Sequence, residues 1–213
     1  MDFNVITSGL KNSWNTFVSN IVAYIVGFLI MAIGSILIVT IAPLVYGMTY
    51  MVLKGVRGEK VEIKDIFYGF KSLNVIIRSW IGLIGIALVP IIIVIIEFVV
   101  VGALTAVSPT AGVLAGLVFL LIVILVEIFL FFAFYIYVMV PSENIIYAIK
   151  ESAAIGKSNI ILVILAIIIS GILGFIGGLL FGIGVLITGP IATLFGAYVL
   201  KELAPGISDA SGQ

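Results

Sequence analysis

Long uncharged runs alternate along the chain with short segments in which charged residues gather. A transmembrane helix needs about 20 apolar residues to cross roughly 30 Å of hydrocarbon. The uncharged runs cover residues 12–53, 79–96, 98–126, 128–142 and 158–200. The first and last runs are each too long for one helix, so both must fold back. The pattern predicts an all-α, polytopic transmembrane helical bundle of about six spans in three hairpins.

Glycine, proline and serine divide these runs, because they favour turns. We expect spans near residues 20–40, 43–57, 79–106, 113–140, 159–176 and 180–200. The segment SPTAG (108–112) would join the central hairpin, and Gly177-Gly178 would form the last turn. Pro43 and Pro190 are candidate helix breaks. Whether the second span crosses the whole bilayer stays open at this stage.

The segments between spans predict interfacial helices and the orientation of the chain. Residues 1–20 and 61–74 place apolar side chains at intervals of three or four, which is typical of a helix with one apolar face. Such helices lie at the membrane surface. With both termini cytoplasmic, all ten Lys and Arg fall on the cytoplasmic side, as the positive-inside rule requires. We therefore expect a multi-pass protein of the cell membrane with cytoplasmic termini.

Two pairs of similar segments predict an internal repeat within a single domain, residues 1–213. KNSWNTFVSN at residue 11 resembles KESAAIGKSN at residue 150, and PLVYGMTYMVLK at residue 43 resembles PIATLFGAYVLK at residue 190. The repeat units would be 9–54 and 148–201, parallel to each other, around a central hairpin 61–140. The alternative is that two segments of similar composition only look repetitive.

Composition excludes most catalytic chemistry. Hydrophobic residues make up 63% of the chain and charged residues 9%, and neither Cys nor His occurs. Disulfides, thiolate nucleophiles, haem ligation and the usual zinc ligands are therefore excluded. We predict no enzyme activity, no catalytic residue, no cofactor, no metal site and no nucleic-acid partner. The expected partners are the lipid bilayer and either a second copy of the chain or another membrane protein.

Two longer motifs resemble a known family. PLVYGMTYMVLKGVRGEKVEIKDIFYGFK (43–71) resembles a family of uncharacterised prokaryotic multi-pass membrane proteins. ENIIYAIKESAAIGKSN (143–159) is similar to the entry helix of those proteins and of the membrane domain that accompanies some glycerophosphodiester phosphodiesterases. The resemblance implies a multi-pass bundle in the cell membrane and no established activity. The phosphodiesterase chemistry is not carried over, because the chain has no histidine or carboxylate cluster for it.

Glu97 and Glu127 stand alone in the predicted third and fourth spans. Ionisable residues inside a membrane are costly and usually face a bundle interior or water. The functional interpretation is an intramembrane ion or proton site. The alternative is a neutral, protonated side chain that donates a hydrogen bond to a neighbouring helix. We expect Glu127 to matter more, because the predicted turn places it nearer the middle of the membrane.

Basic and glycine residues each allow a functional and a structural interpretation. Lys54, Arg57 and Lys60 are candidate contacts for anionic lipid headgroups, although interleaved acidic residues favour an ordinary topology signal. Gly174, Gly178 and Gly182 recur every four residues, which favours close helix packing.

Function follows from the sequence only as a class. We expect transport-like or lipid-handling activity, and the alternative is a non-enzymatic membrane scaffold or assembly factor. A transporter predicts that Glu97 or Glu127 faces a water-filled cavity. A scaffold predicts a packed interior and a partner surface on the interfacial helices.

Overall fold

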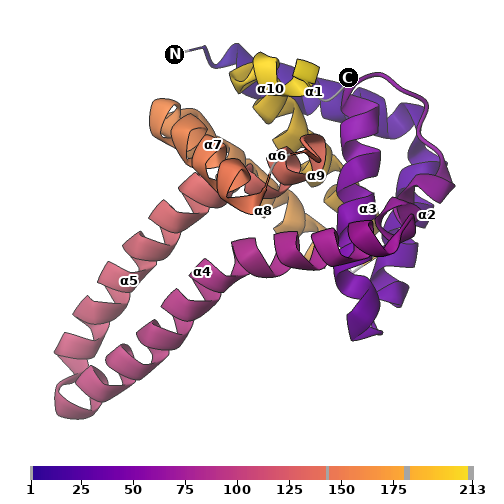
Figure 1. Ribbon diagram of the computed structural model, residues 1–213. Coiled ribbons are helices and arrows are strands. Elements are labelled where there is room, and N and C mark those ends of the chain that lie inside the picture. Colours follow the sequence, from indigo (N-terminus) through magenta and orange to yellow (C-terminus); the bar gives the residue numbers. More distant parts are fainter. Residues whose placement is uncertain (1, 143, 180–182, 211–213) are drawn as a thin grey trace.

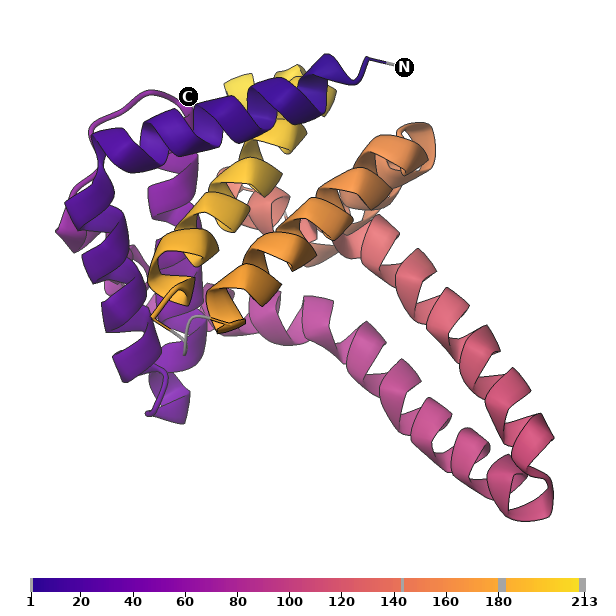
Figure 2. The ribbon, with the colours of Figure 1, turned by 180° about the vertical axis from the view of Figure 1, so that it is seen from behind.

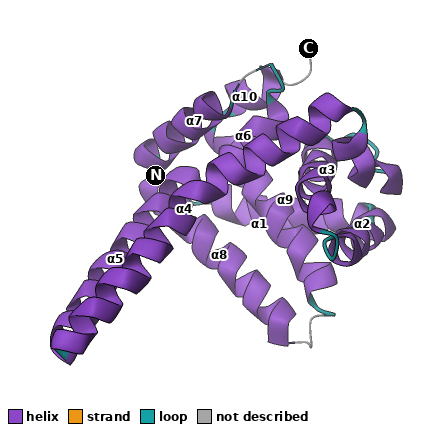
Figure 3. Ribbon diagram, turned by 60° about the horizontal axis from the view of Figure 1, so that its bottom comes forward, coloured by secondary structure: helices purple, strands orange, loops and turns teal. Residues whose placement is uncertain are grey.

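The computed structural model describes residues 2–142, 144–179 and 183–210, and all regular secondary structure in these ranges is helical (Figures 1 and 3). The helices are α1 (Asn4–Ser19), α2 (Ile21–Gly34), α3 (Ile38–Val56), the 3₁₀ helix η1 (Ile63–Phe70), α4 (Leu73–Val107), α5 (Pro109–Leu130), α6 (Ala133–Met139), α7 (Ile145–Ser158), α8 (Ile160–Leu179), α9 (Val185–Leu203) and α10 (Pro205–Ala210). The predicted all-α class is confirmed.

Within the described ranges, five helical segments are long and apolar enough to cross a membrane. They are α3, α4, the combined segment Pro109–Met139, α8 and α9. The pair α1 and α2, bent by 90° at its junction, gives a sixth if the two helices together count as one span. The chain is therefore a multi-pass membrane protein.

Helix lengths differ from the predicted spans. At 1.5 Å per residue, the 14 residues of α2 measure about 21 Å, and the 35 residues of α4 about 52 Å. Neither matches the roughly 30 Å of a hydrocarbon core. The 19 residues of α3 measure about 28 Å, because this helix begins at Ile38 and not at the predicted proline.

All helices except α4 and α5 pack into one group, which we call the body. Within it, α1, α7, α10 and both chain termini lie at one end (Figures 1 and 2). Its largest fully buried side chains include Phe17, Tyr24, Tyr46, Phe132 and Phe195. Lipid tails are as apolar as these side chains, so close packing holds such a group together in a bilayer.

The helices α1 and α7 end in the same way. At the junctions with α2 and α8, Asn20 has φ −131° and ψ 29°, and Asn159 has φ −131° and ψ 35°. The Asn20 side-chain Nδ2 donates to Thr16 O at 3.1 Å, and that of Asn159 donates to Ile155 O at 3.2 Å. Each side chain therefore binds a carbonyl of the last helical turn. The backbone of the two junctions thus has the same local geometry, and the repeat itself stays a prediction.

Pro43 and Pro190 do not break their helices, so that prediction is wrong. Pro43 is the sixth residue of α3 and Pro190 the sixth of α9, and both helices have 19 residues. A proline removes one N–H donor and crowds the carbonyl four positions earlier. A proline so near the start of a helix therefore disturbs little more than the first turn. Neighbouring helices can support the backbone groups that it leaves without a hydrogen bond.

The segment η1 runs back along α3 with the two backbones in direct contact. A Cβ atom added at Gly47 would lie 1.8 Å from Ile66 O, and one added at Gly69 would lie 2.0 Å from Pro43 O. Only glycine, which lacks Cβ, permits such an approach. The two glycines therefore fix where η1 lies and where α4 begins.

The helices α4 and α5 form a hairpin that projects from the body (Figures 1 and 2). The two helices are close together at the tip and farther apart where they join the body. None of the most apolar 18-residue window of α4 is buried. The predicted SPTAG turn shrinks to Ser108 alone, which begins α5 by accepting a hydrogen bond from Ala111 N at 3.5 Å. At the tip, Gly112 allows close approach of Thr105.

The predicted turn at Gly177-Gly178 is also wrong, because α8 continues to Leu179 and Gly177 packs against Thr188 of α9. The predicted close packing at Gly174 and Gly178 is not observed: a Cβ atom added at either position would have no neighbour within 4 Å. Gly182, the third member of that series, lies outside the described residues.

Candidate functional site

Glu127 lies where α4 and α5 diverge, in a space that we call the fork hollow. This hollow has a volume of about 250 Å³ and brings together residues from both arms of the hairpin. Its lining residues are Leu83, Ile86, Ala87, Pro90, Glu127, Leu130, Phe131 and Phe134. Glu127 is thus the one polar side chain among eight, and it is exposed.

The chemistry of the fork hollow is that of a single acceptor in apolar surroundings. The Glu127 carboxyl group forms no hydrogen bond or ion pair with any residue that the structure describes. An ionised carboxylate among apolar groups is costly unless a cation pairs with it. The predicted hydrogen bond to a neighbouring helix is therefore not formed within the described part of the chain.

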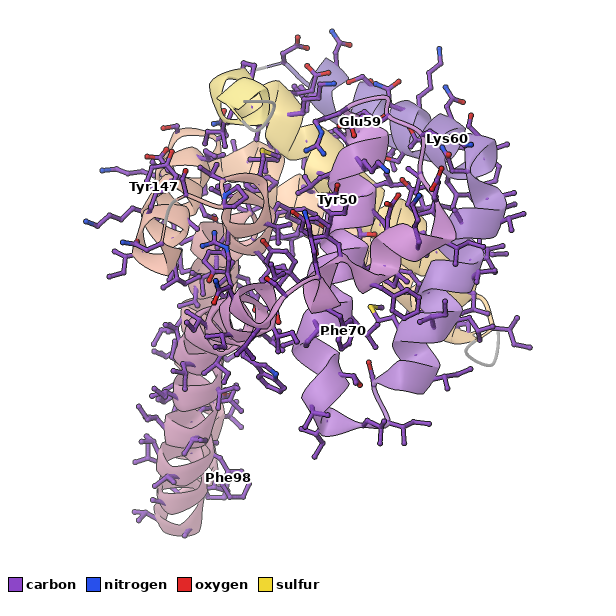
Figure 4. All side chains as sticks on the ribbon, turned by 45° about the vertical axis from the view of Figure 1, so that its right-hand side comes forward. Tyr50, Glu59, Lys60, Phe70, Phe98 and Tyr147 are labelled. Carbon is purple, nitrogen blue, oxygen red and sulfur yellow. The ribbon has the colours of Figure 1, made fainter. Side chains whose placement is uncertain are left out.

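Glu97 lies in a different hollow, farther along the hairpin. That hollow has a volume of about 510 Å³ and is lined only by α4 residues, namely Val94, Glu97, Phe98, Val101 and Gly102. Figure 4 shows Phe98 near the outer end of the hairpin, far from Tyr50 and Phe70 of the body. Like Glu127, Glu97 has no polar partner among the described residues.

The two carboxyl groups do not share one hollow. Glu97 is 11 residues before Ser108 and Glu127 is 19 residues after it. These separations correspond to about 16 Å and 28 Å along the helices. Because α5 begins at residue 109, Glu127 is farther from the tip than the sequence predicted. Glu97 is thus about 12 Å nearer the hairpin tip than Glu127.

Lys54, a candidate headgroup contact, holds η1 against α3. Its Nζ donates to Asp65 Oδ2 at 2.8 Å, and both side chains are largely buried, 17% and 8% exposed. The same Asp65 oxygen accepts the main-chain N–H of Glu62 at 2.8 Å. This geometry assigns Lys54 a structural contact.

The other two candidate headgroup contacts also have acidic neighbours. Arg57 forms an ion pair with Glu59, and Lys60 lies 3.7 Å from Glu62 with 86% of its side chain exposed. Lys64, whose ammonium is 2.6 Å from Glu62, lowers the pKa of that carboxyl group. Figure 4 shows Glu59 and Lys60 at the α1 end of the body. Lys60 is therefore the most accessible of the three predicted contacts.

Arg78 is a polar centre that was not predicted from the sequence. It lies inside α4, and its Nη2 donates to Tyr137 O at 2.8 Å and to Val140 O at 3.1 Å. The guanidinium carbon is 4.0 Å from the centroid of the Tyr137 ring, and the Tyr137 hydroxyl donates to Arg78 O at 3.0 Å. These contacts join α4 to α6. The available signal was the apolar run on both sides of Arg78, which is typical of a position inside a helix.

Comparison with models of protein families, with curated proteins and with solved structures finds no match to this chain. The family resemblance of segments 43–71 and 143–159 therefore stays a prediction.

Proposed function

We propose that this protein handles lipids in the cell membrane, binding an amphiphile at the hairpin fork, and that it is not an enzyme. Its termini lie on the cytoplasmic side in this proposal. The observation that carries it is the fork hollow, in which seven apolar side chains surround the single carboxyl group of Glu127. Apolar walls with very few polar groups are typical of small-molecule sites.

The size and position of the fork hollow favour an amphiphile. A volume of about 250 Å³ is below the usual range for a site that encloses a whole drug-sized ligand, about 300–1,000 Å³. We therefore expect the hollow to take the polar end and the first part of a chain. The rest of the molecule would lie along the apolar surface of α4 and α5.

Transport through the body is less well supported. The buried polar side chains of the described residues are Ser13, Asp65, Ser79, Ser152 and Thr188. Each takes part in an internal hydrogen bond, mostly to a backbone group. They therefore support packing and do not line a continuous polar path.

Fluorescence quenching of Trp80 tests amphiphile binding. Trp80 precedes Leu83 and Ala87 by three and seven residues in α4, so it shares a helix face with this side of the fork hollow. Trp14→Phe leaves Trp80 as the sole tryptophan. In uncharged maltoside micelles, a dodecyl amphiphile with a nitroxide headgroup should quench Trp80 saturably, and Ala87→Phe, which fills the hollow, should weaken binding. Quenching that is linear and equal in both proteins would refute the proposal.

A second candidate function is a scaffold that assembles with another copy through the outer hairpin. Gly102 and Gly116 have open space around them, which permits close approach of another helix. Phe98 is 82% exposed nearby. Because the chain lacks cysteine, Phe98→Cys can be oxidised in membranes. A disulfide-linked dimer at low expression would support this function, and an unchanged monomer would exclude it.

A further inference from the structure

We infer that the polar group bound at the fork hollow is a quaternary ammonium. This inference rests on the proposed amphiphile binding and names its ligand class.

The charge of the ligand follows from Glu127. No Lys or Arg occurs between Arg78 and Lys150, so neither arm of the hairpin beyond Arg78 supplies a cation. Arg78 itself contacts the carbonyls of Tyr137 and Val140 and lines a different hollow. The balancing charge for an ionised Glu127 must therefore come from outside the hairpin. A cationic ligand provides it and leaves no isolated charge.

The type of cation follows from the other lining residues. Their side chains are those of Leu, Ile, Ala, Pro and Phe, and none of these accepts a hydrogen bond. A primary ammonium has three N–H donors, and Glu127 could not satisfy all of them in this hollow. A quaternary ammonium has no N–H group, and its methyl groups can pack against the aliphatic side chains.

The aromatic side of the hollow strengthens this assignment. Phe131 and Phe134 line it together with Glu127. The face of an aromatic ring attracts a cation, and aromatic residues are the usual partners of quaternary ammonium ligands. One carboxylate, two phenyl rings and aliphatic walls thus offer a suitable contact for each part of an alkyl-trimethylammonium group.

Position along the hairpin favours the same chemistry. Glu127 is the fourth residue from the end of α5, at the arm that leads back into the body. A charged headgroup held there would have its alkyl chain beside the apolar hairpin. Both a free alkylammonium and the choline group of a lipid have this form.

Paired amphiphiles test the charge directly. Both would carry a nitroxide headgroup and a dodecyl chain, one through a quaternary dimethylammonium link and the other through a neutral amide link. In Trp80 quenching titrations of the Trp14→Phe protein in maltoside micelles, we expect the cationic amphiphile to bind at least about tenfold more tightly. Glu127→Gln, which preserves size, should abolish the preference. Glu97→Gln should retain it, because it removes the other carboxyl group of the hairpin outside the fork hollow.

Two further measurements keep the test decisive. Phe134→Leu should reduce the preference for the cationic amphiphile severalfold. This variant replaces Glu127→Gln in the test if gel filtration and circular dichroism show that Glu127→Gln does not fold. A phosphocholine analogue distinguishes the two possible ligands: tight binding indicates a choline lipid, and weak binding indicates a free alkylammonium. Both results uphold the inference if the preference for the cationic amphiphile depends on Glu127. Equal binding of cationic and neutral amphiphiles would overturn the inference while amphiphile binding stands. Saturable binding of neither would refute the proposed function itself.

Discussion

The contact between η1 and α3 provides the sharpest test of the fold. Alanine at Gly47 would place its Cβ 1.8 Å from Ile66 O, whereas real Cβ atoms essentially never lie closer than 3.0 Å to another atom. The two backbones must therefore separate by about 1.2 Å, the difference between these values. Alanine at Gly69, 2.0 Å from Pro43 O, requires a separation of about 1.0 Å.

The cost of this separation can be estimated from the neighbouring contacts. Overpacking a close contact costs about 1–3 kcal/mol. A rigid shift of about 1.2 Å would also lengthen the 2.8 Å contact between Lys54 and Asp65 to about 4.0 Å, beyond hydrogen-bond range. We expect each substitution to lower the free energy of unfolding by about 3 kcal/mol. The double variant should cost much less than twice this amount, because the first substitution already separates the segments.

Thermal unfolding in detergent, followed by gel filtration, measures this effect. For a chain of this size, about 3 kcal/mol corresponds to a decrease in Tm of about 6–12 °C. Gly116→Ala and Gly171→Ala are matched controls, since an added Cβ there has no neighbour within 4 Å. They should be neutral or stabilise by up to about 1 kcal/mol through helix propensity. If the Tm of Gly47→Ala equals that of these controls, the backbone contact is not formed as described.

Three further predictions concern charged residues and topology. Lys54→Met should destabilise the protein by about 3 kcal/mol by leaving Asp65 buried without its cation, and adding Asp65→Asn should recover part of that loss in the same unfolding assay. Arg78→Lys should lower Tm by several degrees, because a single ammonium cannot reproduce a planar guanidinium that stacks on a ring and donates to two carbonyls. With cytoplasmic termini, an impermeant thiol reagent should label Val107→Cys in intact cells but not Ser142→Cys, and the reverse pattern would contradict the proposed orientation.

The sequence predicted the elements that depend on local chemistry. Asn20 and Asn159 belong to two segments that look similar in sequence, and both have nearly the same backbone dihedrals and the same side-chain hydrogen bond to the preceding turn. Helical hairpins were predicted correctly because an uncharged run much longer than one membrane span must fold back. Pro43 was misinterpreted, since propensity alone does not show that a helix begins five residues earlier.

Features that depend on tertiary contact could not be predicted. Nothing in the sequence near Gly47 or Gly69 shows that η1 packs against α3, because the two contacts join positions 19 and 26 residues apart through a reversal of the chain. The fork hollow also depends on how far α4 and α5 diverge, and Glu127 alone does not indicate it. The sequence did select both glutamates as unusual, because charge within an apolar run is visible without a structure.

The position of the hairpin tip has a consequence for how the chain can be divided. Ser108 separates a segment that carries α1–α4 from one that carries α5–α10. The turn that joins α4 to α5 lies far from the body (Figures 1 and 2). The two segments interlock in the body, where α1 and α3 both lie against α9. Fragments made separately could therefore recognise each other through body contacts that do not need the connection. Loop tips remote from the core are also where insertions are best tolerated. The hairpin tip is thus the place where this chain can be split or extended with the smallest effect on the rest of the fold.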